Sequence, residues 1–127
     1  MDVTTPTESS TNCHQVSEIL SRIGDKWTVL LVRALHAQPH RFGSLRRQVN
    51  GISQQMLTRT LKNLERDGIV ARTVHATNPP QVEYALTALG RSLGATVKLL
   101  ADWALANHEW IRESRTRYDS AQQRSPG

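Results

Sequence analysis

The 127-residue sequence has a single cysteine and few aromatic residues. With only Cys13 present, a disulfide bond within one chain is excluded. No apolar run is long enough to span a bilayer, and the first residues lack the charged, apolar and small-residue regions of a signal peptide. We therefore expect a single domain in a reducing cytoplasm, with no membrane partner.

Sequence patterns of common enzyme active sites are also missing. There is no glycine-rich phosphate loop, no nucleophile elbow and no HExxH sequence. The five histidines form no Cys/His cluster with zinc spacing, and Pro39 interrupts the helix that would align His36 with His40. The sequence predicts a protein that is not an enzyme and needs no metal or cofactor.

Acidic residues are fewer than basic ones, and the net charge is +5. This excess is local. Seven Arg or Lys residues against two acidic ones lie between Gln38 and His75, whereas the segments on either side are nearly neutral. A local excess of cations is expected for a surface that binds a polyanion such as DNA. A membrane surface is the weaker interpretation, because the basic residues do not oppose a broad, aromatic-rich apolar face.

The segment SQQMLTRTLKNLERDG, residues 53–68, organises the chain. Spacing of i, i+4 and i+7 predicts one buried helical stripe, made of Leu57, Leu61 and Leu64. The opposite stripe carries Gln, Arg and Lys, which can bond adenine, guanine and phosphate in a DNA groove. Ser53 is the expected N-cap, and Gly68 is expected to end the helix. Any surface helix has a polar, solvated face, so this pattern alone does not distinguish a helix that binds DNA from an ordinary surface helix. The flanking segments decide between these two interpretations.

A second helix is predicted just before this segment. In GSLRRQVN, residues 43–50, Leu45 and Val49 are expected to point inward and the two arginines outward, after a short extended piece at Arg41-Phe42. Asn50-Gly51-Ile52 provides a short turn. A helix, a short glycine-containing turn and a polar-faced helix make a helix-turn-helix.

After Gly68 the apolar period changes from 3.6 to 2. Residues 69–74 and 82–86 alternate in polarity and are separated by the loop ATNPP, which predicts a β-hairpin. A hairpin that follows such a helix directly is the wing of a winged helix. The expected fold class is mainly α (α+β), a winged helix-turn-helix with a two-stranded wing and terminal dimerisation helices.

The two ends of the domain are predicted to be helical. Residues 16–23 predict a short amphipathic helix, and Asp25 is expected to cap a central core helix that ends before Pro39. After the expected cap at Thr87, apolar residues recur for about six helical turns, which is long for so small a domain. Such a stripe is more easily buried against a second subunit than against the small core of its own domain. We expect disordered tails at residues 1–12 and 119–127 around a domain of residues 13–118.

An ordered set of short motifs runs from about Cys13 to about Trp103. It comprises Cys13; Ile23-Gly24-Asp25-Lys26-Trp27; Arg41-Phe42 with Leu45; Gly51-Ile52-Ser53; Met56-Leu57; Leu61, Leu64, Glu65, Asp67 and Gly68; Pro80; Val82-Glu83-Tyr84, Leu86 and Thr87; and Gly90. This set resembles the HxlR-type regulators, a branch of the MarR-like winged-helix transcription factors. Two departures are Asp25, where many relatives have a second Gly, and a wing tip without Arg or Lys.

The resemblance implies a homodimer clamped by its terminal helices. The leading hypothesis is a dimeric repressor that binds a pseudo-palindromic double-stranded DNA operator. The helix that begins at Ser53 would enter the major groove, and the hairpin would reach the neighbouring minor groove or backbone. The alternative is a winged helix that serves as a protein-interaction or nonspecific DNA-binding module.

Candidate DNA contacts fall into three groups. Near the start of the predicted recognition helix, the candidates for reading bases are Gln55, Thr58 and Arg59, and Ser53 and Gln54 are further candidate DNA contacts. Candidate backbone contacts are Arg41, Arg46, Arg47, Lys62 and Arg66; alternatively, the last two are merely solvated, or one of the first three pairs with Glu65 or Asp67. On the wing, they are His75 and Asn78. The predicted dimer interface comprises Val16, Ile19, Leu20, Leu93, Val97, Leu100, Trp103 and Trp110.

Cys13 has two interpretations. It is expected just before the first helix, next to His14, and a helix N-terminus favours the reactive thiolate. Some HxlR-like and MarR-like proteins sense oxidants or electrophiles through such a cysteine, with DNA release as output. Oxidation could then give an intersubunit disulfide, a mixed disulfide or a sulfenic acid. The alternative is a small residue packed in the dimer interface, with a small-molecule effector acting elsewhere.

Overall fold

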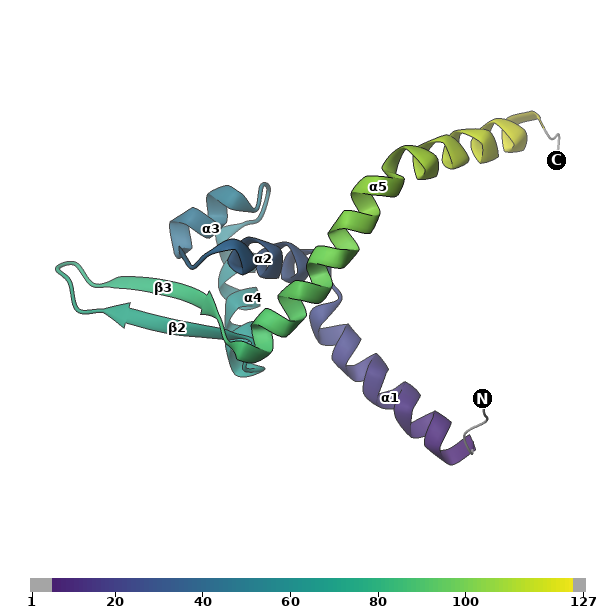
Figure 1. Cartoon of the computed structure of the whole chain (residues 1–127). Coiled ribbons are helices and arrows are strands. Elements are labelled where there is room, and N and C mark those ends of the chain that lie inside the picture. Colours follow the sequence, from purple (N-terminus) through teal and green to yellow (C-terminus); the bar gives the residue numbers. More distant parts are fainter. Residues whose placement is uncertain (1–5, 125–127) are drawn as a thin grey trace.

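The computed structural model describes the backbone of residues 6–124 and the side chains of residues 12–124. The elements, in chain order, are α1 (Pro6–Ile23), α2 (Lys26–Ala37), β1 (His40–Arg41), α3 (Phe42–Gln48), α4 (Gln54–Arg66), β2 (Val70–His75), β3 (Gln81–Leu86) and α5 (Ala88–Arg124). The body contains α2, α3, α4 and the sheet, and α1 and α5 project from it as two diverging arms (Figure 1). The predicted winged helix-turn-helix is confirmed.

Three side-chain caps fix where helices begin. The carboxylate of Asp25 accepts from the backbone N–H of Thr28 at 3.0 Å. Ser53 Oγ accepts from the N–H of Met56 at 3.0 Å, and Thr87 Oγ1 accepts from the N–H of Gly90 at 3.0 Å. Each cap satisfies a backbone donor that the first helical turn leaves without a partner. All three predicted caps are therefore confirmed.

The core lies between α2, α4, α3 and the base of the hairpin. Its fully buried side chains include the predicted leucines of α4, together with Leu45 of α3 and Leu31 of α2. Burying a leucine stabilises a fold by roughly 1.5–3 kcal/mol, so this cluster holds the two helices of the helix-turn-helix in place. The predicted inward positions Leu45 and Val49 are both buried.

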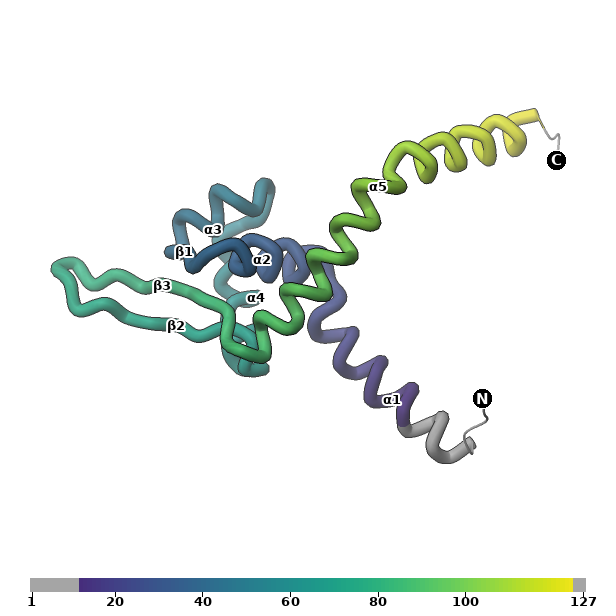
Figure 2. The backbone as a smooth tube through the Cα atoms, in the orientation of Figure 1, coloured from purple at the N-terminus to yellow at the C-terminus, as the bar shows by residue number. Residues whose placement is uncertain are grey.

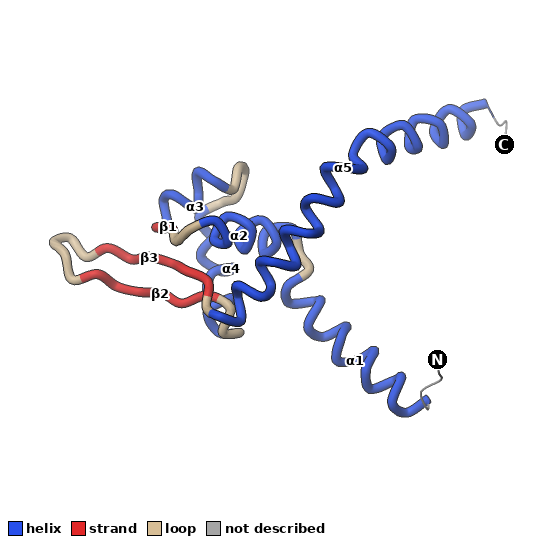
Figure 3. Tube along the Cα trace, viewed as in Figure 1, coloured by secondary structure: helices blue, strands red, loops and turns tan. Residues whose placement is uncertain are grey.

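The sheet is antiparallel, with strand order β1-β3-β2. The hairpin register pairs Val70 with Leu86 and His75 with Gln81, so the two predicted wing strands are confirmed. Beyond its base the hairpin extends away from the helices (Figure 3). The short extended piece lies one residue earlier than predicted, because β1 is His40–Arg41 and Phe42 already begins α3.

The prediction of disordered tails is wrong over the residues that the structure describes. Residues 6–12 belong to α1, and residues 1–5 and 125–127 lie outside the described backbone (Figure 1). Residues 119–124 belong to the end of α5 (Figure 2). Pro6 stands at the first helical position, where its fixed φ and missing N–H cost little. Polar composition lowers the burial of a segment without preventing a helix, which explains both errors.

Candidate nucleic-acid interface

The outer face of α4 is polar, basic and open to solvent. Leu57, Leu61 and Leu64 point into the core, and Thr60 satisfies its buried hydroxyl by donating to the carbonyl of Met56 at 2.7 Å. The polar side chains that remain free to bind a partner therefore lie on the opposite side of the helix. Side chains from the first turns line one shallow, open depression there: Ser53, Gln54, Gln55, Thr58, Arg59 and Lys62.

The turn before α4 does not cover the N-terminal end of the helix. The hydrogen-bonding side chains of this face are therefore exposed there. Gly51 makes the turn with φ +89°, a conformation that favours glycine, and Ile52 anchors the turn in the core. Amide, hydroxyl and guanidinium groups are the side chains that distinguish base edges in the major groove. The structure therefore brings the predicted base-reading residues together on one exposed surface.

The predicted backbone-contacting arginines lie beside this helix on α3 and β1. Arg41 is the N-cap residue of α3, and Arg46 and Arg47 lie in its last turn, all three exposed. Arg41 and Arg47 line a second depression with Glu83 of β3. The alternative in which one of these arginines pairs with Glu65 or Asp67 is wrong. Within residues 12–124 no ion pair joins them to either carboxylate, and Asp67 binds another residue, described below.

The wing places His75 and Asn78 in solvent. His75 Nε2 lies 3.3 Å from Glu83 Oε1, so this histidine has a carboxylate neighbour on the next strand. At the tip, Thr77 donates its hydroxyl to the carbonyl of Pro79 at 2.8 Å. Glu83 was not among the predicted site residues, although strict alternation along both strands places it on the same face as His75.

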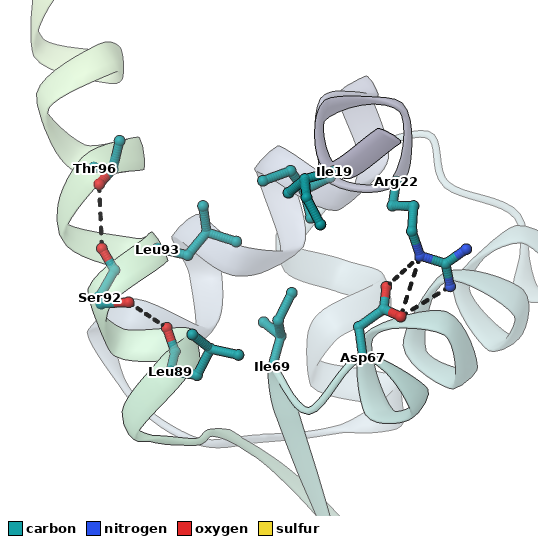
Figure 4. A pocket seen from close by; sticks show the side chains of 9 residues that line it. Ile19, Arg22, Asp67, Ile69, Leu89, Ser92, Leu93 and Thr96 are labelled. Atoms are coloured by element: carbon teal, nitrogen blue, oxygen red, sulfur yellow. Dashed lines mark hydrogen bonds and ion pairs between the residues drawn. The ribbon is translucent and has the colours of Figure 1, made fainter. Parts of the chain in front are cut away.

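An apolar pocket of about 460 Å³ lies between α1, the end of α4 and the start of α5. Ile19, Ile69, Leu89 and Leu93 line it, and the charged pair Arg22 and Asp67 lies at its edge (Figure 4). The pair was missed in the sequence. Arg22 and Asp67 are 45 positions apart, and no local pattern joins them.

The predicted dimer interface is largely exposed within the single chain. The exposed side chains are Val16, Ile19 and Leu20 on α1 and Leu100, Trp103 and Trp110 on α5. Leu93 is half-buried and packs against the core. Val97 is a correction: it is only 5% exposed, because α5 turns this side toward the core of its own subunit.

Cys13 is exposed and lies inside α1, several residues after the helix begins. The expectation that it precedes the first helix is therefore wrong, because α1 begins at Pro6. Within the described residues, no group of three His, Cys, Asp or Glu side chains is placed to hold a metal ion. None of the described helices is both long and apolar enough to cross a membrane.

Comparison with known proteins supports the same assignment. The model of the HxlR-like helix-turn-helix family matches residues 22–113. The HTH-type transcriptional regulator YtfH of Escherichia coli is 42% identical over 90 residues, which cover 71% of each chain.

Solved structures also resemble this fold closely. The transcriptional regulator ytfH from Salmonella typhimurium has a TM-score of 0.74 and 39% identity, covering 80% of this chain and 90% of that one. The redox regulator HypR in its reduced form has a TM-score of 0.72 and 38% identity, covering 78% of this chain and 98% of that one. The chain belongs to the HxlR-like helix-turn-helix family and is a transcriptional regulator with a winged-helix DNA-binding fold.

Proposed function

We propose that this regulator represses transcription by binding a pseudo-palindromic operator as a homodimer, with Gln55, Thr58 and Arg59 reading base edges. The observation that carries the proposal is the exposed polar face on the first turns of α4. Recognition helices of this class place their N-terminal residues against bases in the major groove. A winged helix used for protein interaction would instead have an apolar outer face on α4.

The remaining cations have a positioning role in this proposal. Lys62 and Arg66 lie further along α4. Arg41 caps α3, the first helix of the helix-turn-helix, and Arg46 and Arg47 lie in its last turn. None of these five side chains forms an ion pair with another residue among residues 12–124, so their charges are available to phosphate. Phosphate contacts fix the register of a protein on DNA, while base contacts give the sequence preference.

Dimerisation is supported by the exposed apolar face of the arms. Leu100, Trp103 and Trp110 are each more than half exposed on α5, a helix of 37 residues. At 1.5 Å per residue, this helix is about 55 Å long, far longer than the body needs to cover its core. A second copy of the chain would bury these residues and set two recognition helices roughly 34 Å apart, one turn of DNA.

The test is DNA binding by fluorescence anisotropy to a fragment of the gene's own promoter, against scrambled competitor. We expect wild type to bind selectively. Gln55→Ala with Arg59→Ala should lose a few kcal/mol of specific binding at most, while its circular dichroism spectrum is unchanged. The matched control is Gln122→Ala with Arg124→Ala, which deletes the same groups at the far end of α5 and should bind as wild type.

Unchanged operator affinity in the α4 double variant would show that this helix is not the reader. If wild type itself shows no selectivity, selection from genomic fragments decides between a distant operator and nonspecific binding. Reporter expression with and without the regulator then distinguishes repression from activation.

A second function is redox sensing at Cys13. Its support is the exposed thiol on a projecting helix, together with the redox regulator HypR, which is known in reduced and oxidised forms, among the similar structures. Oxidant should release DNA from wild type and have no effect on Cys13→Ser. A matched control, Cys13→Ser with Ser17→Cys, moves the thiol one helical turn along α1. DNA release that persists in Cys13→Ser contradicts this function.

A further inference from the structure

The segment that ends the recognition helix is tied to both arms. Asp67 is the C-cap residue of α4, and Gly68 with φ +78° turns the chain into Ile69 and β2. Any movement of this segment moves the end of α4 and the base of the wing together. It is therefore a place where the position of the arms can act on the DNA-binding elements.

Arg22 of α1 binds this segment through two nitrogens. Its Nε donates to Asp67 Oδ2 at 2.9 Å and Oδ1 at 3.1 Å, and its Nη2 donates to Oδ1 at 2.9 Å. The pair is drawn at the pocket edge in Figure 4. Hydrogen bonding to Asp67, reinforced by the attraction between the charges, raises the pKa of Arg22 above its ordinary value. A planar guanidinium held by a carboxylate in this way fixes direction as well as distance.

The other described side chains of α1 make few contacts with the body. Between residues 12 and 23, all side chains are exposed except Ile23, which is half-buried against the core. The helix leaves the body at a steep angle and does not lie along it (Figure 1). Ile23 and the link at Gly24 join α1 to the body, and among residues 12–23 only Arg22 makes a side-chain hydrogen bond to the C-cap of α4.

The second arm meets the same segment from the other side. Thr87, which caps α5, donates its hydroxyl to the carbonyl of Gly68 at 2.6 Å and its N–H to the carbonyl of Ile69 at 3.0 Å. Gly90 packs so closely that a Cβ there would overlap the Ile69 carbonyl oxygen. The segment Asp67–Ile69 thus connects α4 and the wing with both α1 and α5.

We infer that Arg22 and Asp67 are a positioning pair that fixes α4 relative to the dimer arms and thereby sets the half-site spacing that the regulator accepts. This rests on the proposed dimeric operator binding. One base pair shifts a half-site by about 3.4 Å and rotates it by about 35° around the DNA axis. A dimer discriminates such steps only if each recognition helix is held rigidly to its arm.

The first test measures spacing selectivity, the ratio of affinities for the preferred operator and operators lengthened or shortened by one base pair. Because a lost or gained charge changes affinity for all three operators alike, it cancels in this ratio. We expect Arg22→Ala and Arg22→Lys each to lower the ratio at least about fivefold, the low end of measured coupling between sites. The exchange Arg22→Asp with Asp67→Arg should restore it.

The matched control is Lys98→Ala, which breaks the exposed pair between Lys98 and Asp102 inside α5, at 3.1 Å, without involving α4. Its spacing selectivity should equal that of wild type. Circular dichroism confirms that each variant is folded. If Arg22→Ala unfolds, Arg22→Lys replaces it in the test, because lysine keeps the charge but loses the two-nitrogen contact. Selectivity unchanged in folded Arg22→Ala or Arg22→Lys overturns the inference.

The second test needs neither DNA nor a dimer. Spin labels at Gln15→Cys on α1 and Asn63→Cys on α4, in Cys13→Ser protein diluted with unlabelled chain, report the distance between the helices within one subunit. The distance distribution should be narrow with Arg22 present, broad in Arg22→Ala and narrow again after the charge exchange. An unchanged width overturns the positioning role. A broadened width with no sequence-selective DNA binding by wild type would instead refute the proposed function alone.

Discussion

Removing one arginine from α3 should reduce the salt dependence of DNA binding by a calculable amount. Five exposed cations in each subunit are placed for phosphate: Arg41, Arg46, Arg47, Lys62 and Arg66. A dimer would then neutralise about ten phosphates, and the slope of log affinity against log salt would be about −9. Affinity should therefore fall roughly 10⁵-fold between 50 and 200 mM salt.

Arg47→Ala removes two of these contacts from the dimer, so its slope should be less negative by about 1.8. Over the same fourfold change in salt, its affinity should fall roughly tenfold less than that of wild type. The assay is fluorescence anisotropy on the selected operator at four or more salt concentrations. Arg112→Ala, which removes an equal charge from a side chain 71% exposed on α5, is the control and should keep the wild-type slope.

Two results would refute this reasoning. If Arg47→Ala and wild type have the same slope, Arg47 does not displace counterions from phosphate. If Arg112→Ala flattens the slope as much as Arg47→Ala does, the effect comes from the charge of the whole protein, and the location of Arg47 on α3 has no special importance.

Three further variants test the fold and the arms. Ser53→Ala removes the cap of α4 and should lower the free energy of unfolding by about 0.5–2 kcal/mol in urea denaturation. Gly90→Ala places a Cβ on a backbone carbonyl and should lower the free energy of unfolding by about 1–3 kcal/mol. Gly43→Ala is the control, because its Cβ meets only a side-chain nitrogen at 3.6 Å, and it should unfold at a clearly higher urea concentration than Gly90→Ala. Leu100→Glu should convert the dimer to monomer in light scattering, while Lys98→Glu, on another side of α5, should not; a dimer that persists in Leu100→Glu excludes this face.

The sequence predicts the body of the molecule well because its signals there are local. In α4, the leucine spacing, the serine cap and the terminal glycine all lie within 16 residues and all indicate the same helix. The exposed polar face follows from the same periodicity, because residues opposite a buried stripe must face solvent. Base-reading candidates such as Gln55 and Arg59 could therefore be named without coordinates.

The arms are predicted less well because their contacts are not local. Polarity at residues 6–12 and 119–124 indicates little burial, yet both segments are helical. Periodicity also could not distinguish Val97, which packs in its own subunit, from Leu100, which is 56% exposed. The pair of Arg22 and Asp67 depends on how two distant helix ends meet, which requires the fold.

This difference has a physical consequence for how the regulator can be controlled. The body buries its leucines within one chain, so α4 and the wing keep their shape whether or not a partner is present. The arms expose Leu20, Trp103 and Trp110, so whatever covers these side chains can change how the arms pack. A signal that changes the packing of the arms therefore need not unfold the reading helix. It can act by moving Asp67–Ile69, a short segment at the end of α4 that both arms contact.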